Sequence, residues 1–386
     1  MNERHAEIAG GGIGGLGLGL MLARKGWSVR IHERSPTIRE VGAAISLRNN
    51  SISVLERCGA FEQLRAEGSF LLRERHFDKR GNLLQERATT GQRTMVLPRQ
   101  SLVEGLAASA RQAGVEIKLS SVVVSADPAG ALIDDAGVRY PADLAVAADG
   151  LHSKIRTELG LRETIRELTT RINRYLVPTQ EFTTPETKDE HWSGDRRVGF
   201  LPAGKGRSLI YTTMASGDGP ACRLPLDVGN WTEAYPTLEP VFRLLRQQDT
   251  IQFSYPFVRC TGWHRGRVAL IGDAAHAMPP TLGQGAGLTL MNSYALAELV
   301  SGSSDVATAL RSWETAVREI TEATQRWSLR YDRITGSLPR ALNALRPHVI
   351  RTIGRFKPLY DSMRVADLGL PLIEQRVREA SAARAA

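Results

Sequence analysis

Three short segments of this sequence combine glycines and acidic residues at spacings that suit a nucleotide. The first is a glycine loop with the pattern G-x-G-x-x-G, formed by Gly10, Gly12, Ile13, Gly14 and Gly15. Such a loop lets backbone N–H groups approach a diphosphate, and a helix beginning there adds positive potential. Glu33, 18 residues after Gly15, can accept hydrogen bonds from both hydroxyl groups of a ribose. These residues predict an adenine dinucleotide, and a glycine-rich turn that binds nothing is the alternative.

The second and third segments also place acidic residues directly after expected strands. In residues 148–156, Asp149 begins an Asp-Gly turn that is equally compatible with a structural role. In residues 266–287, a buried strand ends at Asp273, whose carboxylate can bond a polyol, and a glycine-rich helix start follows at Gly283, Gly285, Ala286 and Gly287. His276 in this segment is interpreted as a packed core imidazole in preference to a catalytic residue.

The elements that must position these segments are predicted from periodicity and turn residues. Residues 6–33 are typical of strand, tight turn, helix and strand, which is a βαβ unit. Residues 165–260 have an alternating, turn-rich β pattern, and helical sequence dominates from 287 onward. Other expected elements are helices at 51–66 and 99–113, a hairpin at 70–87 and a buried strand at 267–271.

This order predicts an α/β (α+β) fold with a Rossmann-like nucleotide-binding domain, an interleaved β-sheet substrate domain and a helical C-terminus. We expect the nucleotide-binding domain to be discontinuous, built from residues 1–70, 95–165 and 260–335. The β-rich substrate domain is expected at 71–94 and 166–259, and the C-terminal helical segment at 336–386.

Composition and charge exclude several classes of protein. With 386 residues and 42% hydrophobic residues, the chain can bury a core. The formal net charge of +9 raises the possibility of a nucleic-acid partner, but residues 333–386 contribute +6 of it and no nucleic-acid motif accompanies them. The three cysteines form no C-x-x-C pair, so no metal site is expected. The uncharged stretch 8–23 is rich in glycine and too short to span a membrane, so we expect a cytoplasmic protein.

In this order and spacing, the three segments resemble the FAD-dependent aromatic hydroxylases of the para-hydroxybenzoate hydroxylase type, which are single-component flavoprotein monooxygenases. The resemblance covers residues 6–335, and its most specific part is the block GD-x-A-H followed by P-x-x-G-Q-G. It implies that the glycine loop and Glu33 hold the ADP half of FAD, and that Asp273 binds the ribityl chain. Asp149 would contact FAD and the pyridine nucleotide, and further FAD contacts would come from Arg34, Arg48 and Arg99.

Within this family, the chain has a closer resemblance to the 2-methyl-3-hydroxypyridine-5-carboxylate oxygenases. The similarity lies in residues 224–240, which include Trp231, and in the pair Met291-Asn292. Asn292 departs from the acidic residue usual in salicylate-type hydroxylases, which favours a hydroxypyridine or related heteroaromatic acid as substrate.

The resemblance also implies a reaction. NADH or NADPH would reduce FAD, and O2 would then form a flavin C4a-hydroperoxide that oxygenates an aromatic or hydroxypyridine carboxylic acid. The carbonyl of Pro280 would face the substrate near the flavin. We expect Arg73, Arg197, Tyr211 and Pro280 to bind the substrate, with an arginine fork on its carboxylate. Pro280, Arg197 and Tyr211 are the expected catalytic residues. Solvent-facing arginines are the alternative for any one of them.

Other functions remain open at this point. The same fold could serve an FAD-dependent reductase or epoxidase, or a non-catalytic flavin-binding interaction protein. A halogenase is disfavoured because the W-x-W-x-I-P signature is absent. The expected partners are a small aromatic or heteroaromatic acid and O2, with no nucleic acid and no membrane, and the protein is expected to be a monomer or a homodimer.

Overall fold

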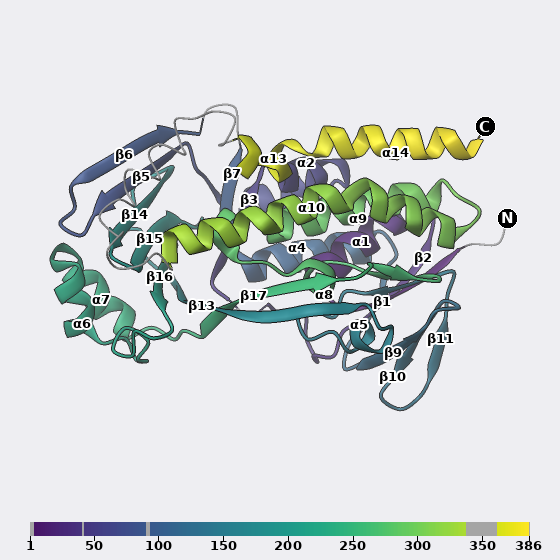
Figure 1. Ribbon diagram of the computed structural model, residues 1–386, viewed down its shortest axis with the longest axis horizontal. Coiled ribbons are helices and arrows are strands. Elements are labelled where there is room, and N and C mark those ends of the chain that lie inside the picture. The colour runs from purple at the N-terminus through teal and green to yellow at the C-terminus, as the bar shows by residue number, and fades with distance from the viewer. Residues whose placement is uncertain (1–3, 41, 90–92, 337–360, 386) are drawn as a thin grey trace.

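A six-stranded sheet forms the centre of the predicted nucleotide-binding part of the computed structural model, which describes residues 4–40, 42–89, 93–336 and 361–385 (Figure 1). Its strand order is β18-β19-β12-β1-β2-β8, and β19, β12, β1, β2 and β8 run parallel. The strands are β1 (His5–Ala9), β2 (Ser28–His32), β8 (Glu116–Lys118), β12 (Leu144–Ala147), β18 (His264–Arg265) and β19 (Val268–Leu270). Because parallel strands end at one edge, the ends of β1, β12 and β19 bring the three predicted segments together.

Helices cover this sheet, and the predicted βαβ unit is confirmed by β1, α1 (Ile13–Ala23) and β2. The core of this part packs α1 against α4 (Arg99–Gln112) and α9 (Gly285–Ser301). The prediction of one helix over 51–66 is wrong. The chain forms α2 (Asn49–Arg57) and α3 (Phe61–Arg65), because Gly59 adopts a φ of +60° between them and ends the first helix.

A seven-stranded sheet forms the second part, in the order β17-β13-β16-β15-β14-β5-β6. The predicted hairpin is confirmed by the antiparallel pair β5 and β6. The strands are β5 (Arg73–Asp78), β6 (Leu83–Ala88), β13 (Arg162–Val177), β14 (Thr187–Ser193), β15 (Arg196–Pro202), β16 (Ser208–Ala215) and β17 (Gln252–Cys260).

The two faces of the seven-stranded sheet differ in chemistry. One face is apolar and packs Phe200 and Ile210 against Trp231 and Phe242, which belong to α6 (Val228–Ala234) and α7 (Glu239–Arg246). These helices correct the expectation of a turn-rich β pattern over 165–260, which included no helix. They form because large apolar side chains recur there at helical spacing and cover the apolar face of the sheet. The opposite face is polar.

The C-terminal part is helical, as predicted. Helix α10 (Val306–Gly336) runs along the molecule, and α14 (Leu370–Ala385) packs against α9 and α10 (Figure 1). Residues 337–360, which contain five of the nine basic residues of the C-terminal segment 336–386, lie outside the described residues. The remaining elements are β3 (Ala44–Arg48), β4 (Ser69–Phe70), β7 (Thr94–Pro98), β9 (Val123–Asp127), β10 (Ala131–Asp134), β11 (Arg139–Pro141), α5 (Lys154–Glu158), α8 (Asp273–His276), α13 (Val365–Leu368) and the 3-10 helices η1 (Pro236–Leu238) and η2 (Pro280–Leu282).

Within the described ranges, no helix is both long enough and apolar enough to cross a membrane.

Candidate cofactor and substrate site

The glycine loop between β1 and α1 contains two kinds of position. Gly10 has a φ of +110°, and a Cβ atom there would collide with the backbone of Ala148 on the neighbouring strand. A Cβ atom at Gly15 would collide with the carbonyl of Gly10. A Cβ atom at Gly12, by contrast, would have its nearest neighbour, Glu40 Oε1, at 3.6 Å. Gly10 and Gly15 therefore allow the turn and the strand packing, while Gly12 leaves space beside the first turn of α1.

Glu33 is held beside this loop at the end of β2. The backbone N–H of Gly11 donates to Glu33 Oε2 at 2.8 Å, and that of Ser35 donates to Oε1 at 2.8 Å. The following residue, Arg34, is exposed. The carboxylate is therefore fixed at the mouth of the glycine loop, as a ribose contact requires.

Arg99 and Asp273 lie close enough for the charge of Arg99 to affect the pKa of Asp273. Arg99 begins α4 and its Nη2 atom is 2.9 Å from Glu40 Oε2. Asp273 begins α8 and is accessible to solvent. Enclosure by the chain raises the pKa of Asp273, and the positive charge of Arg99 opposes that shift. Among the described residues this carboxylate forms no ion pair, so it can accept hydrogen bonds from hydroxyl groups.

The glycines at the start of α9 are also of two kinds, those that leave open space and those that allow close packing. Gly283 has a φ of +64° and follows η2, and a Cβ atom there would lie 3.7 Å from Arg48 Nε. Around Gly285, a Cβ atom would meet nothing within 4 Å, whereas at Gly287 it would lie 2.8 Å from Asn50. Ala286 lies between these two glycines and is half-buried. Gly285 therefore leaves open space, and Gly287 allows α9 to pack on α2.

Arg156 joins the second segment to the third. Its side chain is fully buried, its Nη1 donates to the Ala274 carbonyl at 2.8 Å, and its Nη2 donates to the Leu151 carbonyl at 2.8 Å. Nearby, burial raises the pKa of Asp149, and Asp149 Oδ1 has no hydrogen-bond partner among the described residues. A buried acceptor without a donor indicates a ligand group at this point.

A row of polar residues crosses the polar face of the seven-stranded sheet. Strand register places Arg174 opposite Tyr211, Tyr211 opposite Gly199, Gly199 opposite Glu190, and Glu190 opposite His76. Because the absent side chain of Gly199 leaves room, the Tyr211 ring crosses β15 and its hydroxyl donates to Glu190 Oε2. The register thus brings residues of five adjacent strands, β13, β16, β15, β14 and β5, together on one face of the sheet.

Charges on this face are buried and matched. Burial alone would raise the pKa of Glu190, but the positive charges of Lys188 and Arg197 outweigh it and lower the pKa to about 2. Lys188 Nζ lies 3.4 Å from Glu190 Oε2, and Arg197 Nη1 lies 3.9 Å from Oε1. Burial, followed by the charge of Glu190, raises the pKa of Tyr211 well above its ordinary value. Glu190 is therefore an anion and Tyr211 a neutral donor at neutral pH.

The polar face lies against the third segment and α10. A narrow cavity of about 90 Å³ is lined by Glu74, His76 and Lys188 of the sheet and by Arg48, Thr281, Leu282 and Tyr331 of the facing elements, among others. In η2, the Pro280 carbonyl accepts a hydrogen bond from the Gly283 N–H at 3.0 Å. One lone pair of this carbonyl is thus used within the turn, and the second is left for a ligand.

Comparison with known proteins identifies the family. Residues 4–326 match the family model described as "FAD binding domain". The chain belongs to this family. It is 36% identical over 357 residues to the 2-heptyl-3-hydroxy-4(1H)-quinolone synthase of Mycobacteroides abscessus, covering 89% of this chain and 93% of the relative. These relationships make the chain a FAD-dependent monooxygenase, as the sequence predicted.

Solved structures agree with this assignment. The tetrameric form of 2-methyl-3-hydroxypyridine-5-carboxylic acid oxygenase has a TM-score of 0.82 and 30% identity, covering 90% of this chain and 98% of that one. HpxO from Klebsiella pneumoniae, complexed with FAD and uric acid, has a TM-score of 0.83 over 94% of this chain and 96% of that one. At 22% identity, the second likeness shows the fold alone.

The residues of this monooxygenase fit FAD. Open positions at Gly12 and Gly285 lie at the starts of α1 and α9, where backbone N–H groups favour phosphate and ring oxygens. The solvent-accessible carboxylate of Asp273 and the unpartnered oxygen of Asp149 add acceptors for hydroxyl and N–H groups. Glu33 completes the set on the ribose side.

Two expectations about the substrate pocket need correction. Arg73 is exposed and lies on the face of β5 opposite to Glu74 and His76, which line the cavity, because side chains alternate along a strand. Asn292 is buried in the core, where its Nδ2 bonds His276 Nε2 and Thr321 Oγ1, each at 3.1 Å. Asn292 therefore supports the buried His276, as the interpretation of a packed imidazole predicted, and carries no direct information about the substrate.

Two charged residues of the monooxygenase were not singled out from the sequence. Glu190 follows Lys188 at a spacing of two in a strand, a signal for one shared face that went unused. Arg174 is partly buried beside Tyr211, and burial and the charge of Arg99 lower the pKa of its guanidinium. Glu190 and Arg174 lie near Arg197 and Tyr211 because of the order of the strands in the sheet. The sequence pattern does not give that order.

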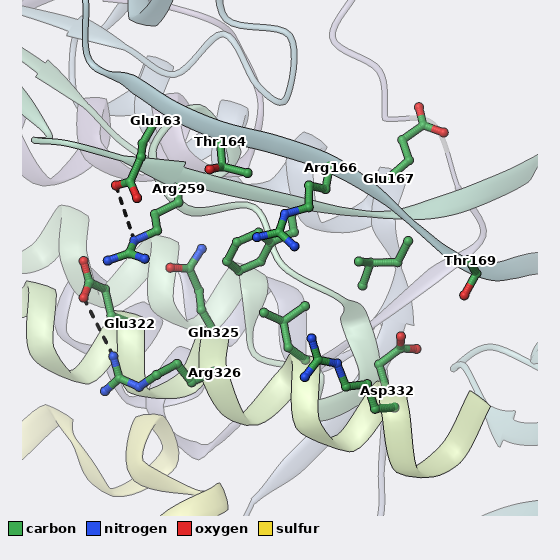
Figure 2. Close-up of a pocket in the computed structure, with 14 residues that line it drawn as sticks. Glu163, Thr164, Arg166, Glu167, Thr169, Arg259, Glu322, Gln325, Arg326 and Asp332 are labelled. Atoms are coloured by element: carbon green, nitrogen blue, oxygen red, sulfur yellow. Dashed lines mark ion pairs between the residues drawn. The ribbon is translucent and has the colours of Figure 1, made fainter. Parts of the chain in front are cut away.

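A separate cavity of about 570 Å³ lies between β13, β17 and α10, outside the predicted site (Figure 2). Figure 2 shows Arg166 pointing into it and the ion pairs Arg259–Glu163 and Arg326–Glu322 at its rim. On its α10 side, Gln325 Nε2 donates to the carbonyls of Val258 at 2.8 Å and Ala277 at 3.2 Å. Its lining has equal numbers of arginines and acids, so it favours no ligand charge.

Proposed function

We propose that this monooxygenase uses NADH or NADPH and O2 to add an oxygen atom to an aromatic or heteroaromatic ring. The ring would bind between the polar face of the seven-stranded sheet and the segment 277–287. The observation that carries this proposal is the group formed on that face by the buried Glu190 and Arg197 and the half-buried Tyr211. Buried, matched charges of this kind hold a polar ring in one orientation.

When bound, FAD supplies the redox chemistry that takes electrons from the nicotinamide and activates O2. The chain would hold it through the glycine loop, Glu33 and Asp273, with Arg48, Arg99 and Asp149 nearby. Pro279 and Pro280 stiffen the loop that covers the reacting ring, because proline fixes φ. The sheet would orient the ring and exclude water from it.

Two ring classes are supported. The sequence resemblance and the oxygenase at 30% identity favour a hydroxypyridine or aromatic carboxylic acid, with Arg197 on the carboxylate. The synthases at 34–36% identity are named for a 3-hydroxy-4(1H)-quinolone, which favours a neutral heterocycle. The shared chemistry is an electron-rich ring with a hydroxyl or oxo group. As part of the same proposal, the interleaved 71–94 and 166–259 segments act as the substrate-binding unit.

The test is substrate-stimulated NAD(P)H oxidation by the FAD-loaded enzyme, measured together with O2 uptake across hydroxybenzoates, hydroxypyridine carboxylates and 4(1H)-quinolones. We expect at least one ring class to stimulate both rates, and its product to contain oxygen from isotopically labelled O2. Stimulation by no ring class would overturn the proposal. Stimulated NAD(P)H oxidation with an organic product that lacks added oxygen would favour a reductase instead.

A further inference from the structure

We infer that Glu190 sets the charge of the ring that this site accepts, selecting an uncharged N–H heterocycle of the 4(1H)-quinolone or pyridone class over a ring carboxylate. The inference rests on the proposed function and concerns the same site. It follows from the contact between Glu190 and Arg197. Arg197 is the cation that a substrate carboxylate would need, and the carboxylate of Glu190 already lies beside it.

Arg197 already has an internal counter-ion. Its side chain is 4% exposed, its Nε donates to Thr213 Oγ1 at 3.1 Å, and its Nη1 lies 3.9 Å from Glu190 Oε1. Its guanidinium also lies over the Trp192 ring, 5.6 Å from the centroid. A carboxylate approaching Arg197 would add a second anion beside Glu190, and like charges repel strongly in a buried site.

Glu190 has one oxygen committed and one available. Oε2 accepts the Tyr211 hydroxyl and lies 3.4 Å from Lys188 Nζ. Among the described residues, Oε1 accepts no hydrogen bond, and Arg197 Nη1 lies 3.9 Å from it. A ring N–H can donate to Oε1 in a charge-assisted hydrogen bond, the stronger class of such bonds. A carboxylate has no proton to donate at neutral pH.

Tyr211 extends this recognition to the ring oxygen. Its ring is placed over Gly199 and its hydroxyl donates to Glu190, so the phenol oxygen keeps its lone pairs as hydrogen-bond acceptors. A ring hydroxyl can donate to that oxygen, while the guanidinium of Arg174 on the next strand can donate to a ring carbonyl. The face therefore offers acceptors for an N–H and a donor for an oxo group.

The test compares two ligands that differ only at C2, namely 2-methyl-4(1H)-quinolone and the same 4(1H)-quinolone with a carboxylate in place of the methyl group. Binding to the oxidised, FAD-loaded enzyme is followed by the change in flavin absorbance. For the wild type we expect the quinolone to bind at least about tenfold more tightly. Glu190→Gln keeps the shape of the side chain and removes the charge, so we expect the preference to shrink by about tenfold or reverse.

Asp189→Asn is the matched control, because Asp189 is the neighbouring buried carboxylate on the opposite face, paired with Arg75 at 2.7 Å. It should leave the preference unchanged. A wild type that binds the carboxylate more tightly, or binds neither ligand, overturns the inference, as does an equal shift in both variants. The wild-type comparison stands even if a variant fails to fold. Binding is measured without turnover, so it tests the charge preference alone. A protein that binds the quinolone but does not oxygenate it would contradict the proposed function and not the charge preference.

Discussion

The phenol ring of Tyr211 lies over Gly199, so a methyl group on residue 199 would be 2.5 Å from the Tyr211 hydroxyl oxygen and closer still to the ring. The two residues face each other on adjacent antiparallel strands, and Glu190 is the next residue across the sheet. A glycine at this point is therefore what allows Tyr211 and Glu190 to meet.

Gly199→Ala should displace Tyr211 and break its hydrogen bond to Glu190, because the ring has no space to share with a Cβ atom. We expect kcat/KM for the ring substrate to fall by about ten- to a hundredfold with FAD content unchanged. Steady-state kinetics and the absorbance of bound flavin measure the two quantities. Gly217→Ala, at an exposed glycine with nothing within 4 Å, should leave both unchanged. Equal kinetics for the two variants would contradict this role of Gly199.

Glu33→Gln should weaken FAD binding by about tenfold, because an amide can accept hydrogen bonds at only one of its two terminal atoms. The carboxylate now accepts from Gly11 and Ser35 through separate oxygens. The dissociation constant of FAD, obtained by titrating the apoprotein, checks this. Glu116→Gln, at an exposed surface glutamate that pairs with Arg30 at 2.8 Å, serves as the comparison and should bind FAD like the wild type.

Arg156→Met should lower both the thermal midpoint and the affinity for FAD. It removes two hydrogen bonds to the carbonyls of Leu151 and Ala274, at a cost of about 2 kcal/mol, and leaves the Ala274 carbonyl with only the weak Cys260 thiol donor at 3.8 Å. The same change at the exposed Arg139 should alter neither property. A normal midpoint in Arg156→Met would mean that the two segments do not depend on this side chain.

His276 should make the fold sensitive to mild acid. Burial lowers its pKa to about 4, from an ordinary value of 6.5, so the folded state disfavours the charged imidazole. The stability that His276 contributes is therefore present above pH 6.5 and falls as the pH drops toward 4, by at most about 1.4 kcal/mol per pH unit.

Unfolding measurements across that pH range, on the wild type and on His276→Asn, check this slope. The stability difference between the two proteins should shrink as the pH falls, because asparagine does not titrate. His152→Asn, which changes an exposed histidine, should keep the wild-type slope. Parallel curves for the wild type and His276→Asn would show that His276 does not titrate as stated.

The sequence alone was sufficient to predict FAD as the cofactor. The glycine loop, Glu33 and the segment from Gly272 to Gly287 are contiguous motifs, and each lies at the end of a parallel strand whose position follows from the βαβ pattern. Local spacing carries such information because a turn and the first residues of the next helix bind the nucleotide directly. Family membership, the monooxygenase class and the mixed α/β fold were predictable on these grounds.

The substrate half was decided by tertiary structure. Arg73 and Glu74 are neighbours in sequence, yet only the face that carries Glu74 lines the cavity, and the packing of the other sheet face on α6 and α7 determines which face that is. Glu190, Gly199 and Tyr211 lie on three strands, and strand order and register bring them together. A period of two shows which residues share a face, but only the packed sheet shows which face is buried and which charges meet there.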